Sequence, residues 1–189
     1  MKDYDHDNNL ALFGVFDGHG GREVAHFTRN HLGELLRSSE SFKSKKYDDA
    51  LTESFFKIDE ELTKDWGRDE IANMKRKNPP NKSPLMKILG DGLGKDGENT
   101  NNENLMLDSI GCTANVVLID NYKKMYVANA GDSRCVLCRK GKAVALSIDH
   151  KPDNDSEKKR IEKAGSTITE GRVDGNLNLS RSLGDLKYK

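Results

Sequence analysis

The run LALFGVFDGHGG spans residues 10–21 and carries much of the information about the fold. Its first seven residues, Leu10 to Phe16, are apolar or glycine and predict a short buried strand. The glycines that follow predict a tight turn at the end of that strand. Asp17 therefore stands directly after a buried strand, where a rigid element can hold its carboxylate in a cleft.

Asp17, Gly18 and His19 form the first candidate site. A glycine after the aspartate lets the backbone carbonyl approach a cation closely. His19 stands two residues beyond Asp17, within reach of the same cleft. A carboxylate, a carbonyl and an imidazole suit a hydrolase that uses a hard metal ion, although an Asp-Gly pair alone is commonly only a turn.

Helical periodicity follows this turn and then disappears. Apolar residues at spacings of three and four predict helices over about 22–37 and 47–66. Residues 67–108 are polar, with several prolines, glycines and asparagines. Charged residues make up 33% of the chain, so part of it is expected to lie outside a packed core. We expect 67–108 to be a mobile insertion in a single domain rather than a domain of its own.

The last third of the chain predicts mainly β-sheet. Expected strands lie near residues 112–119, 125–128, 134–138, 143–146, 167–169 and 177–179, and a helix is expected over 157–164. The longer strands are apolar on both faces, which predicts a sheet that is covered on each side.

Two further acidic segments follow these strands. The segment ANAGDSR, residues 128–134, surrounds Asp132 with small residues, which fits a metal-ligand corner or, equally well, a β-turn. The segment NLSRSLGD, residues 178–185, has no obvious site geometry. For Asp185 we favour a structural role, capping backbone amides, over a catalytic one.

Taken in order, these motifs resemble those of the metal-dependent protein phosphatases of the 2C type. The matching runs are FGVFDGHGG (13–21), IGCTA (110–114), ANAGDSR (128–134), DHKP (149–152) and LNLSRSLGD (177–185). The resemblance covers about residues 10–66 and 109–189. It implies an α/β fold in which a sandwich of two antiparallel β-sheets is flanked by helices on both sides, formed here by one domain, 1–189, truncated at both ends.

The resemblance also implies an activity, the hydrolysis of phosphoserine and phosphothreonine in phosphoproteins with Mg²⁺ or Mn²⁺. By position, Asp17 would bridge two metal ions, Gly18 would give its carbonyl to one of them, and Asp132 would lie at the rim near a third. His19 would protonate the leaving alkoxide, a role that suits an imidazole. Two cations about 3.5–4 Å apart screen the phosphate and activate a bridging water for attack, and oxygen ligands select hard ions over zinc.

Some family elements have no counterpart here. The family's Glu-Asp pair and phosphate-binding arginine precede its Asp-Gly-His motif, but residues 1–9 match neither, although Asp3, Asp5 and Asp7 are present. Its later Asp-Gly and Asp-Asn motifs are also missing. Asp17 and Asp132 cannot neutralise the four charges of two divalent ions. We therefore expect 1–189 to be an incomplete, inactive catalytic domain; the alternative is a pseudo-phosphatase that serves as a binding or regulatory module.

The amino-acid composition argues against several other classes of protein. Lys plus Arg and Asp plus Glu both number 31, so the basic excess of a nucleic-acid binder is missing. Three cysteines do not make a disulfide scaffold, and Cys135 with Cys138 lacks the second pair of a zinc site, so buried strand thiols are favoured. No apolar run approaches the about 18 residues of a membrane span. We expect an intracellular monomer, cytoplasmic or nuclear, without nucleic-acid or membrane partners.

Overall fold

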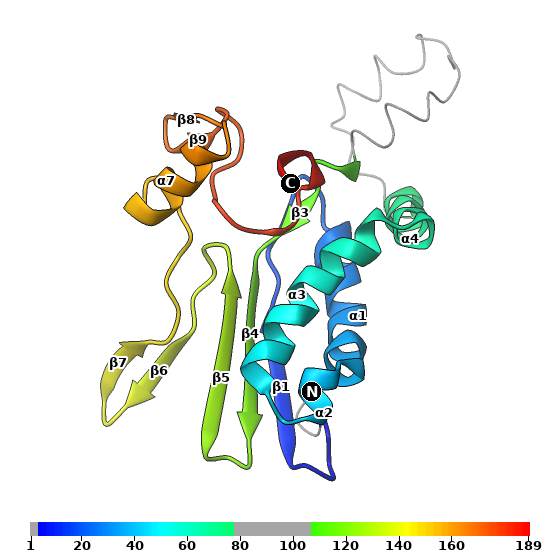
Figure 1. Ribbon diagram of the computed structural model, residues 1–189, viewed down its shortest axis with the longest axis vertical. Coiled ribbons are helices and arrows are strands. Elements are labelled where there is room, and N and C mark those ends of the chain that lie inside the picture. Colours follow the sequence, from blue (N-terminus) through cyan, green and yellow to red (C-terminus); the bar gives the residue numbers. More distant parts are fainter. Residues whose placement is uncertain (1–3, 78–106) are drawn as a thin grey trace.

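The structure, a computed structural model, describes residues 4–77 and 107–189 (Figure 1). In chain order its elements are β1 (Leu10–Val15), β2 (Gly18–His19), α1 (Glu23–Ser38), α2 (Glu40–Lys43), α3 (Tyr47–Thr63), α4 (Asp65–Lys77), β3 (Gly111–Cys112), β4 (Ala114–Asp120), β5 (Lys124–Ala130), β6 (Val136–Arg139), β7 (Lys142–Ala145), α7 (Asp155–Lys163), β8 (Ile168–Thr169), β9 (Arg172–Val173), β10 (Leu183–Gly184) and the 3₁₀ helix η1 (Leu186–Tyr188). The mixed α/β class with antiparallel sheets is as predicted.

The largest sheet has the strand order β1-β4-β5, and both pairings are antiparallel. The central strand, β4, is the most buried of the three, as its β-branched sequence ANVVLID leads one to expect. A second sheet of very short strands, β10-β3-β2, continues from one end of the first, because β3 is separated from β4 only by Thr113. Asp17, which follows β1, and Asp132, which follows β5, both lie at that end of the large sheet.

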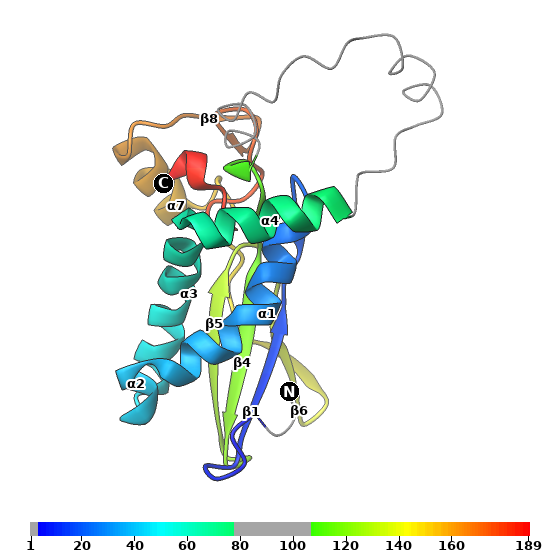
Figure 2. The ribbon, with the colours of Figure 1, turned by 90° about the vertical axis from the view of Figure 1, so that its right-hand side faces the viewer.

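Helices α1 and α3 cover one face of the large sheet (Figure 2). Their apolar stripes meet the sheet's inward side chains in one core. Its members include Leu10 and Leu12 of β1, Val116 and Leu118 of β4, Phe27 and Leu36 of α1, and Leu51 and Ile58 of α3.

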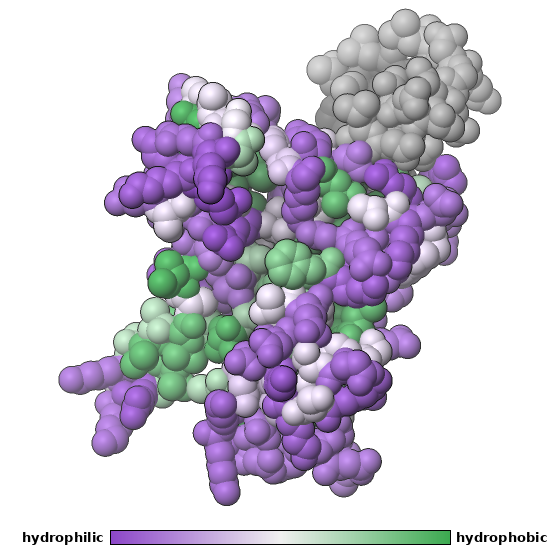
Figure 3. Space-filling model, viewed as in Figure 1, coloured by the Kyte–Doolittle hydropathy of each residue, from purple (hydrophilic) through white to green (hydrophobic). Residues whose placement is uncertain are grey.

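The other face of the sheet carries exposed apolar side chains in the described part of the chain. Phe13 and Val15 of β1 are exposed because they alternate with the buried Leu12. Val136 and Val144 are exposed as well, and Figure 3 shows apolar surface over the β6–β7 hairpin that carries them. The expectation that both faces are covered is therefore not met by residues 4–77 and 107–189. Cys138 on β6 is also exposed, against the expectation of a buried thiol.

The prediction for residues 67–108 is wrong at its start, because Gly67 to Lys77 belong to helix α4. Ile71 and Ala72 of this helix join the core. The signal was weak because charged residues outnumber the apolar ones in DWGRDEIANMKRK. Residues 78–106 lie outside the described residues. The short strand expected at 177–179 is replaced by a single bridge between Val173 and Leu177.

Among the described residues, no helix combines the length and the apolar character that crossing a bilayer requires.

Phe27 should be among the costliest core positions to truncate. Its side chain is 0% exposed, and the centroid of its ring lies 4.4 Å from the ring centroid of His31 and 5.3 Å from that of Trp66. We expect Phe27→Ala to lower the free energy of unfolding by about 3–5 kcal/mol, measured by chemical denaturation. Phe56→Ala is the matched control, because that side chain is 73% exposed and its loss should cost less than about 0.5 kcal/mol. Equal losses would contradict this assignment of the core.

Candidate active site

The two-residue strand β3 joins motifs that are far apart in the sequence. On one side, Gly18 and His19 of β2 pair with Cys112 and Gly111. On the other side, Leu183 and Gly184 of β10 pair with the same two residues. The turn after β1 and the end of the NLSRSLGD segment are therefore held next to each other. Periodicity could not predict this pairing, because strands of two residues have no readable pattern.

His19 and Asp185 contact each other across this small sheet. The Nε2 atom of His19 lies 2.6 Å from Oδ2 of Asp185. Asp185 is 2% exposed, and the hydroxyl of Ser182 donates a second hydrogen bond to the same oxygen, at 2.5 Å. Asp185 precedes η1, but its side chain does not cap that helix. The predicted role of Asp185 in capping backbone amides is therefore wrong.

Asp17 lies on the turn between β1 and β2 with its side chain exposed. Its backbone is fixed by the buried Thr113, whose Oγ1 accepts from the Asp17 N–H at 3.1 Å and whose N–H donates to the Asp17 carbonyl at 2.9 Å. Within the described residues, the carboxylate of Asp17 has no hydrogen-bond or ion-pair partner. The backbone is thus rigid while the carboxylate stays available to a ligand.

The loop of Asp132 is connected to the loop of Asp17 through Thr113. Thr113 Oγ1 lies 2.7 Å from the hydroxyl oxygen of Ser133, the residue after Asp132. Gly131, with φ 105°, packs so closely on Thr113 that an added Cβ would lie 2.8 Å from its methyl group. The expected position of Asp132 between two strands is confirmed, since it follows β5 and precedes β6.

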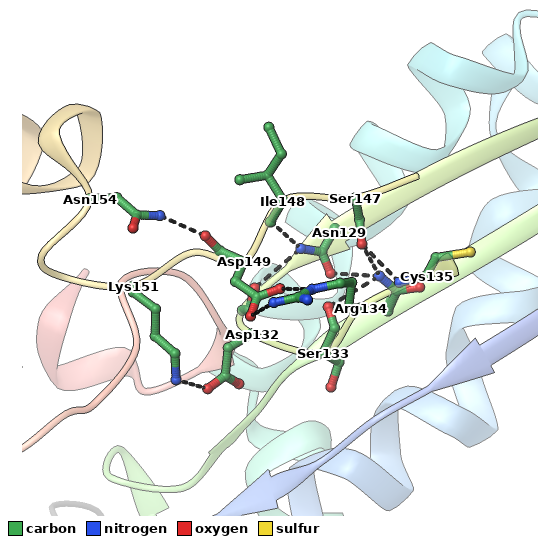
Figure 4. Close-up of polar contacts among 12 residues, drawn as sticks. Asn129, Asp132, Ser133, Arg134, Cys135, Ser147, Ile148, Asp149, Lys151 and Asn154 are labelled. Carbon is green, nitrogen blue, oxygen red and sulfur yellow. Dashed lines mark hydrogen bonds and ion pairs between the residues drawn. The ribbon is translucent and has the colours of Figure 1, made fainter. Parts of the chain in front are cut away.

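A polar network holds the segment around Asp132 (Figure 4). Lys151, from the DHKP run, forms an ion pair with Asp132. Arg134 makes two hydrogen bonds of 2.8 Å to Asp149, and the Arg134 guanidinium lowers the pKa of that carboxyl below its ordinary value. Asn129 donates to the carbonyls of Gly131 and Ile148. ANAGDSR and DHKP thus form one structural unit.

The residues present fit a hard metal ion in kind but not in number. Asp17, the Gly18 carbonyl and Asp132 offer the oxygen donors that Mg²⁺ and Mn²⁺ prefer. Yet within 4–77 and 107–189 no group of three or more His, Cys, Asp or Glu side chains is placed to hold a metal, and Asp132 is already neutralised by Lys151. The described residues alone therefore do not complete a metal centre.

Comparison with known proteins identifies the family. The protein phosphatase 2C family model matches residues 1–78 and 65–189. The chain belongs to the protein phosphatase 2C family. It is 47% identical over 185 residues to a probable protein phosphatase 2C of Paramecium tetraurelia, covering 98% of this chain and 52% of the relative. It is 39% identical over 202 residues to one from Arabidopsis thaliana, covering 98% and 54%.

Solved structures support the 2C phosphatase fold. A Caenorhabditis elegans sex-determining protein matches with a TM-score of 0.65 and 27% identity, over 95% of this chain and 36% of that one. A phosphatase from Toxoplasma gondii matches with a TM-score of 0.58 and 22% identity, over 95% and 58%. The chain spans about half the length of the curated relatives just described.

In this member of the 2C family, a buried ionic cluster surrounds Glu157 of α7, and no sequence motif predicts it. Glu157 is 4% exposed and accepts hydrogen bonds from Arg181 at 2.9 and 2.8 Å, Arg160 at 2.9 Å and Ser180 at 2.8 Å. Burial by itself would raise the pKa of Glu157, but the hydrogen bonds from Arg181, Arg160 and Ser180 outweigh it and lower the pKa to about 2. The cluster fixes the segment that leads to Asp185 onto α7.

Glu157→Gln should lower the free energy of unfolding by about 1–3 kcal/mol, because it removes the charge that two arginines face. The wild-type contribution also depends on pH. Because the folded pKa lies below the ordinary 4.5, the stabilisation is complete above about pH 4.5 and is lost as the pH falls towards about 2. Denaturation at neutral and acid pH measures both effects. Glu162→Gln, exposed on the same helix, is the control; an equal loss there would contradict the role of the cluster.

Proposed function

We propose that this chain forms part of a metal-dependent protein serine/threonine phosphatase that hydrolyses phosphoserine and phosphothreonine in phosphoproteins. The observation that carries the proposal is the turn between β1 and β2. On it, an exposed carboxylate, a strand carbonyl and an imidazole occur at three consecutive positions, Asp17 to His19, on a backbone fixed by Thr113. Membership of the protein phosphatase 2C family supports the same reaction.

Each residue of this turn has a separate role in the proposed reaction. Asp17 and the carbonyl of Gly18 would hold Mg²⁺ or Mn²⁺, with Asp132 at the rim of the site once its carboxylate is released from Lys151. When bound, divalent ions neutralise the phosphate's charge and lower the pKa of water. The imidazole of His19 gives a proton to the leaving serine or threonine oxygen, which is otherwise expelled as a strong base.

A pseudo-phosphatase that only binds partners is the second candidate, but it is less favoured. The contact between His19 and a buried carboxylate is an arrangement that a binding module does not need. A monomeric state and an intracellular location stay predictions. The free thiols of Cys112, Cys135 and Cys138 are compatible with a reducing compartment.

The test of this function uses the full-length natural protein. We expect it to release phosphate from phosphoserine and phosphothreonine peptides when Mn²⁺ or Mg²⁺ is supplied, and to lose this activity in excess chelator. Restoring the metal should restore turnover. Full activity in chelator would contradict metal dependence, and no turnover with either metal on any phosphopeptide would favour the binding module.

A further inference from the structure

We propose that Asp185 is the positioning residue of His19, and that it keeps a hydrogen on Nε2 so that the leaving oxygen receives its proton from Nδ1. The inference rests on the proposed function of His19 as the general acid. It goes further by naming the partner that orients the ring and the ring nitrogen that delivers the proton.

Asp185 is held in place through both its carboxylate and its backbone. Its Oδ2 accepts from the Ser182 hydroxyl at 2.5 Å, and its backbone N–H donates to the Ile110 carbonyl at 2.9 Å. Asp185 also holds a left-handed backbone conformation, with φ 49°, which is uncommon for a residue other than glycine. A buried carboxylate that is held by these hydrogen bonds can keep the imidazole ring of His19 in one orientation.

Gly111 provides the space for this contact. A Cβ on Gly111 would lie closer than 3.0 Å to Oδ2 of Asp185 and 2.7 Å from Nε2 of His19, so any side chain there would push the pair apart. Gly111 pairs with His19 on one side and Gly184 on the other. The short strand β3 therefore aligns the two partners and leaves room between them.

The hydrogen bond to Asp185 determines which ring nitrogen of His19 carries no hydrogen in the neutral imidazole. An ionised carboxylate only accepts hydrogen bonds, so the ring atom that faces Asp185, Nε2, must carry a hydrogen. In the neutral ring the unprotonated nitrogen is then Nδ1, and in the protonated ring Nδ1 holds the transferable proton. Orientation of a catalytic imidazole by a buried aspartate is an established way to fix the tautomer.

A water oxygen forms a new bond to phosphorus, and the bond from phosphorus to the serine or threonine oxygen breaks. That oxygen keeps the electron pair and takes the proton from Nδ1 of His19. The neutral ring that remains keeps its hydrogen on Nε2, against Asp185, and the proton lost by the water passes to solvent.

Asp59 provides a matched control. Asp59 is a partly buried carboxylate that, like Asp185, contacts the segment around β10. It accepts a hydrogen bond from the Gly184 N–H and forms an ion pair with Lys189. Among the residues that the structure describes, the contacts of Asp59 do not include His19. A variant at Asp59 therefore disturbs the same segment while leaving the proposed contact in place.

The experiment combines NMR with kinetics on the full-length protein, labelled with ¹⁵N in histidine. At a pH where the ring is neutral, wild-type His19 should show the Nε2–H tautomer. Asp185→Asn should populate the Nδ1–H tautomer, because the amide can present an N–H to Nε2. It should also slow phosphoserine peptides about 10- to 100-fold while aryl phosphates change less than about 3-fold, because their leaving groups need no proton. Asp59→Asn should change neither the tautomer nor the ratio of the two rates.

Two results would overturn the proposal. One is an Nδ1–H tautomer in wild-type protein, a measurement that needs no variant. The other is an Asp185→Asn protein with an unchanged tautomer or with equal losses on both substrates. If Asp185→Asn does not fold, Gly111→Ala replaces it, with the same shift in tautomer and substrate ratio expected. A correct tautomer in a protein without phosphatase activity would refute the proposed function and leave the orienting contact intact.

Discussion

Asp17→Ala in the full-length protein should abolish phosphopeptide hydrolysis, a loss of at least about 10⁴-fold in kcat/KM. The carboxylate of Asp17 is the exposed anionic group on the turn that also carries Gly18 and His19. In the proposed site the divalent ions would then lack an anionic ligand, and water cannot replace its charge. Titration calorimetry with Mn²⁺ should show weaker binding in parallel with the loss of turnover.

The fold should survive this substitution. The Asp17 side chain is exposed, and its backbone is held by Thr113 through bonds that an alanine can make equally well. The midpoint of thermal unfolding without metal should therefore stay near that of wild type. Asp7→Ala is the control, because Asp7 is exposed in the turn before β1 begins, at the strand end opposite to Asp17 (Figure 1). Retained activity in Asp17→Ala, or an equal loss in Asp7→Ala, would refute the metal role of Asp17.

The long periodic elements were predictable because their signal is local. The helix expected over 22–37 is α1, Glu23–Ser38, and most of the one expected over 47–66 is α3, Tyr47–Thr63. The strand expected over 10–16 is β1, Leu10–Val15. In each, the stripe or run of apolar residues is long enough to indicate a helix or a strand, and burial of those residues in the common core stabilises that secondary structure.

Helix α4 was missed because its stability comes from packing. Its apolar side chains are few, but Ile71 and Ala72 are buried with α1 and α3, and Arg68 forms an ion pair with Asp108 at 3.1 Å. A helix that depends on such tertiary contacts has little local signal. Composition identified the polar character of this stretch but could not show where the helical part ends.

In the candidate site, too, local features were predictable and tertiary contacts were not. Asp17, Gly18, His19 and Asp132 could be selected from their local motifs, while the pairing of His19 with Asp185 could not. The two residues are 166 positions apart, and the strands that bring them together have two residues each. The Glu157 cluster was missed for the same reason, since Arg181 lies 24 positions away from it. Side-chain pairs of this kind depend on the tertiary fold and leave no periodic pattern.

His19→Ala is expected to slow phosphoserine and phosphothreonine peptides by about 10²–10⁴-fold, the usual contribution of a general acid. Aryl phosphates should slow by less than about 3-fold, because a phenolate leaves without being protonated. Steady-state kinetics on both substrate types measure the difference. His6→Ala, exposed in the turn before β1, is the matched control and should change neither rate.

The comparison between substrates separates the acid from other roles that His19 could have. If the imidazole only bound phosphate or supported the turn, its loss would affect both substrate types alike, because they share the phosphoryl group. A selective loss can arise only where the leaving oxygen takes up a proton in the transition state. Equal losses on both substrates would therefore show that His19 is not the acid, whereas a selective loss shared by Asp185→Asn would indicate that the two side chains act as one unit.

The double variant then provides the final check: adding Asp185→Asn to His19→Ala should cost no further activity, since a positioning residue has no function once the group it positions is gone.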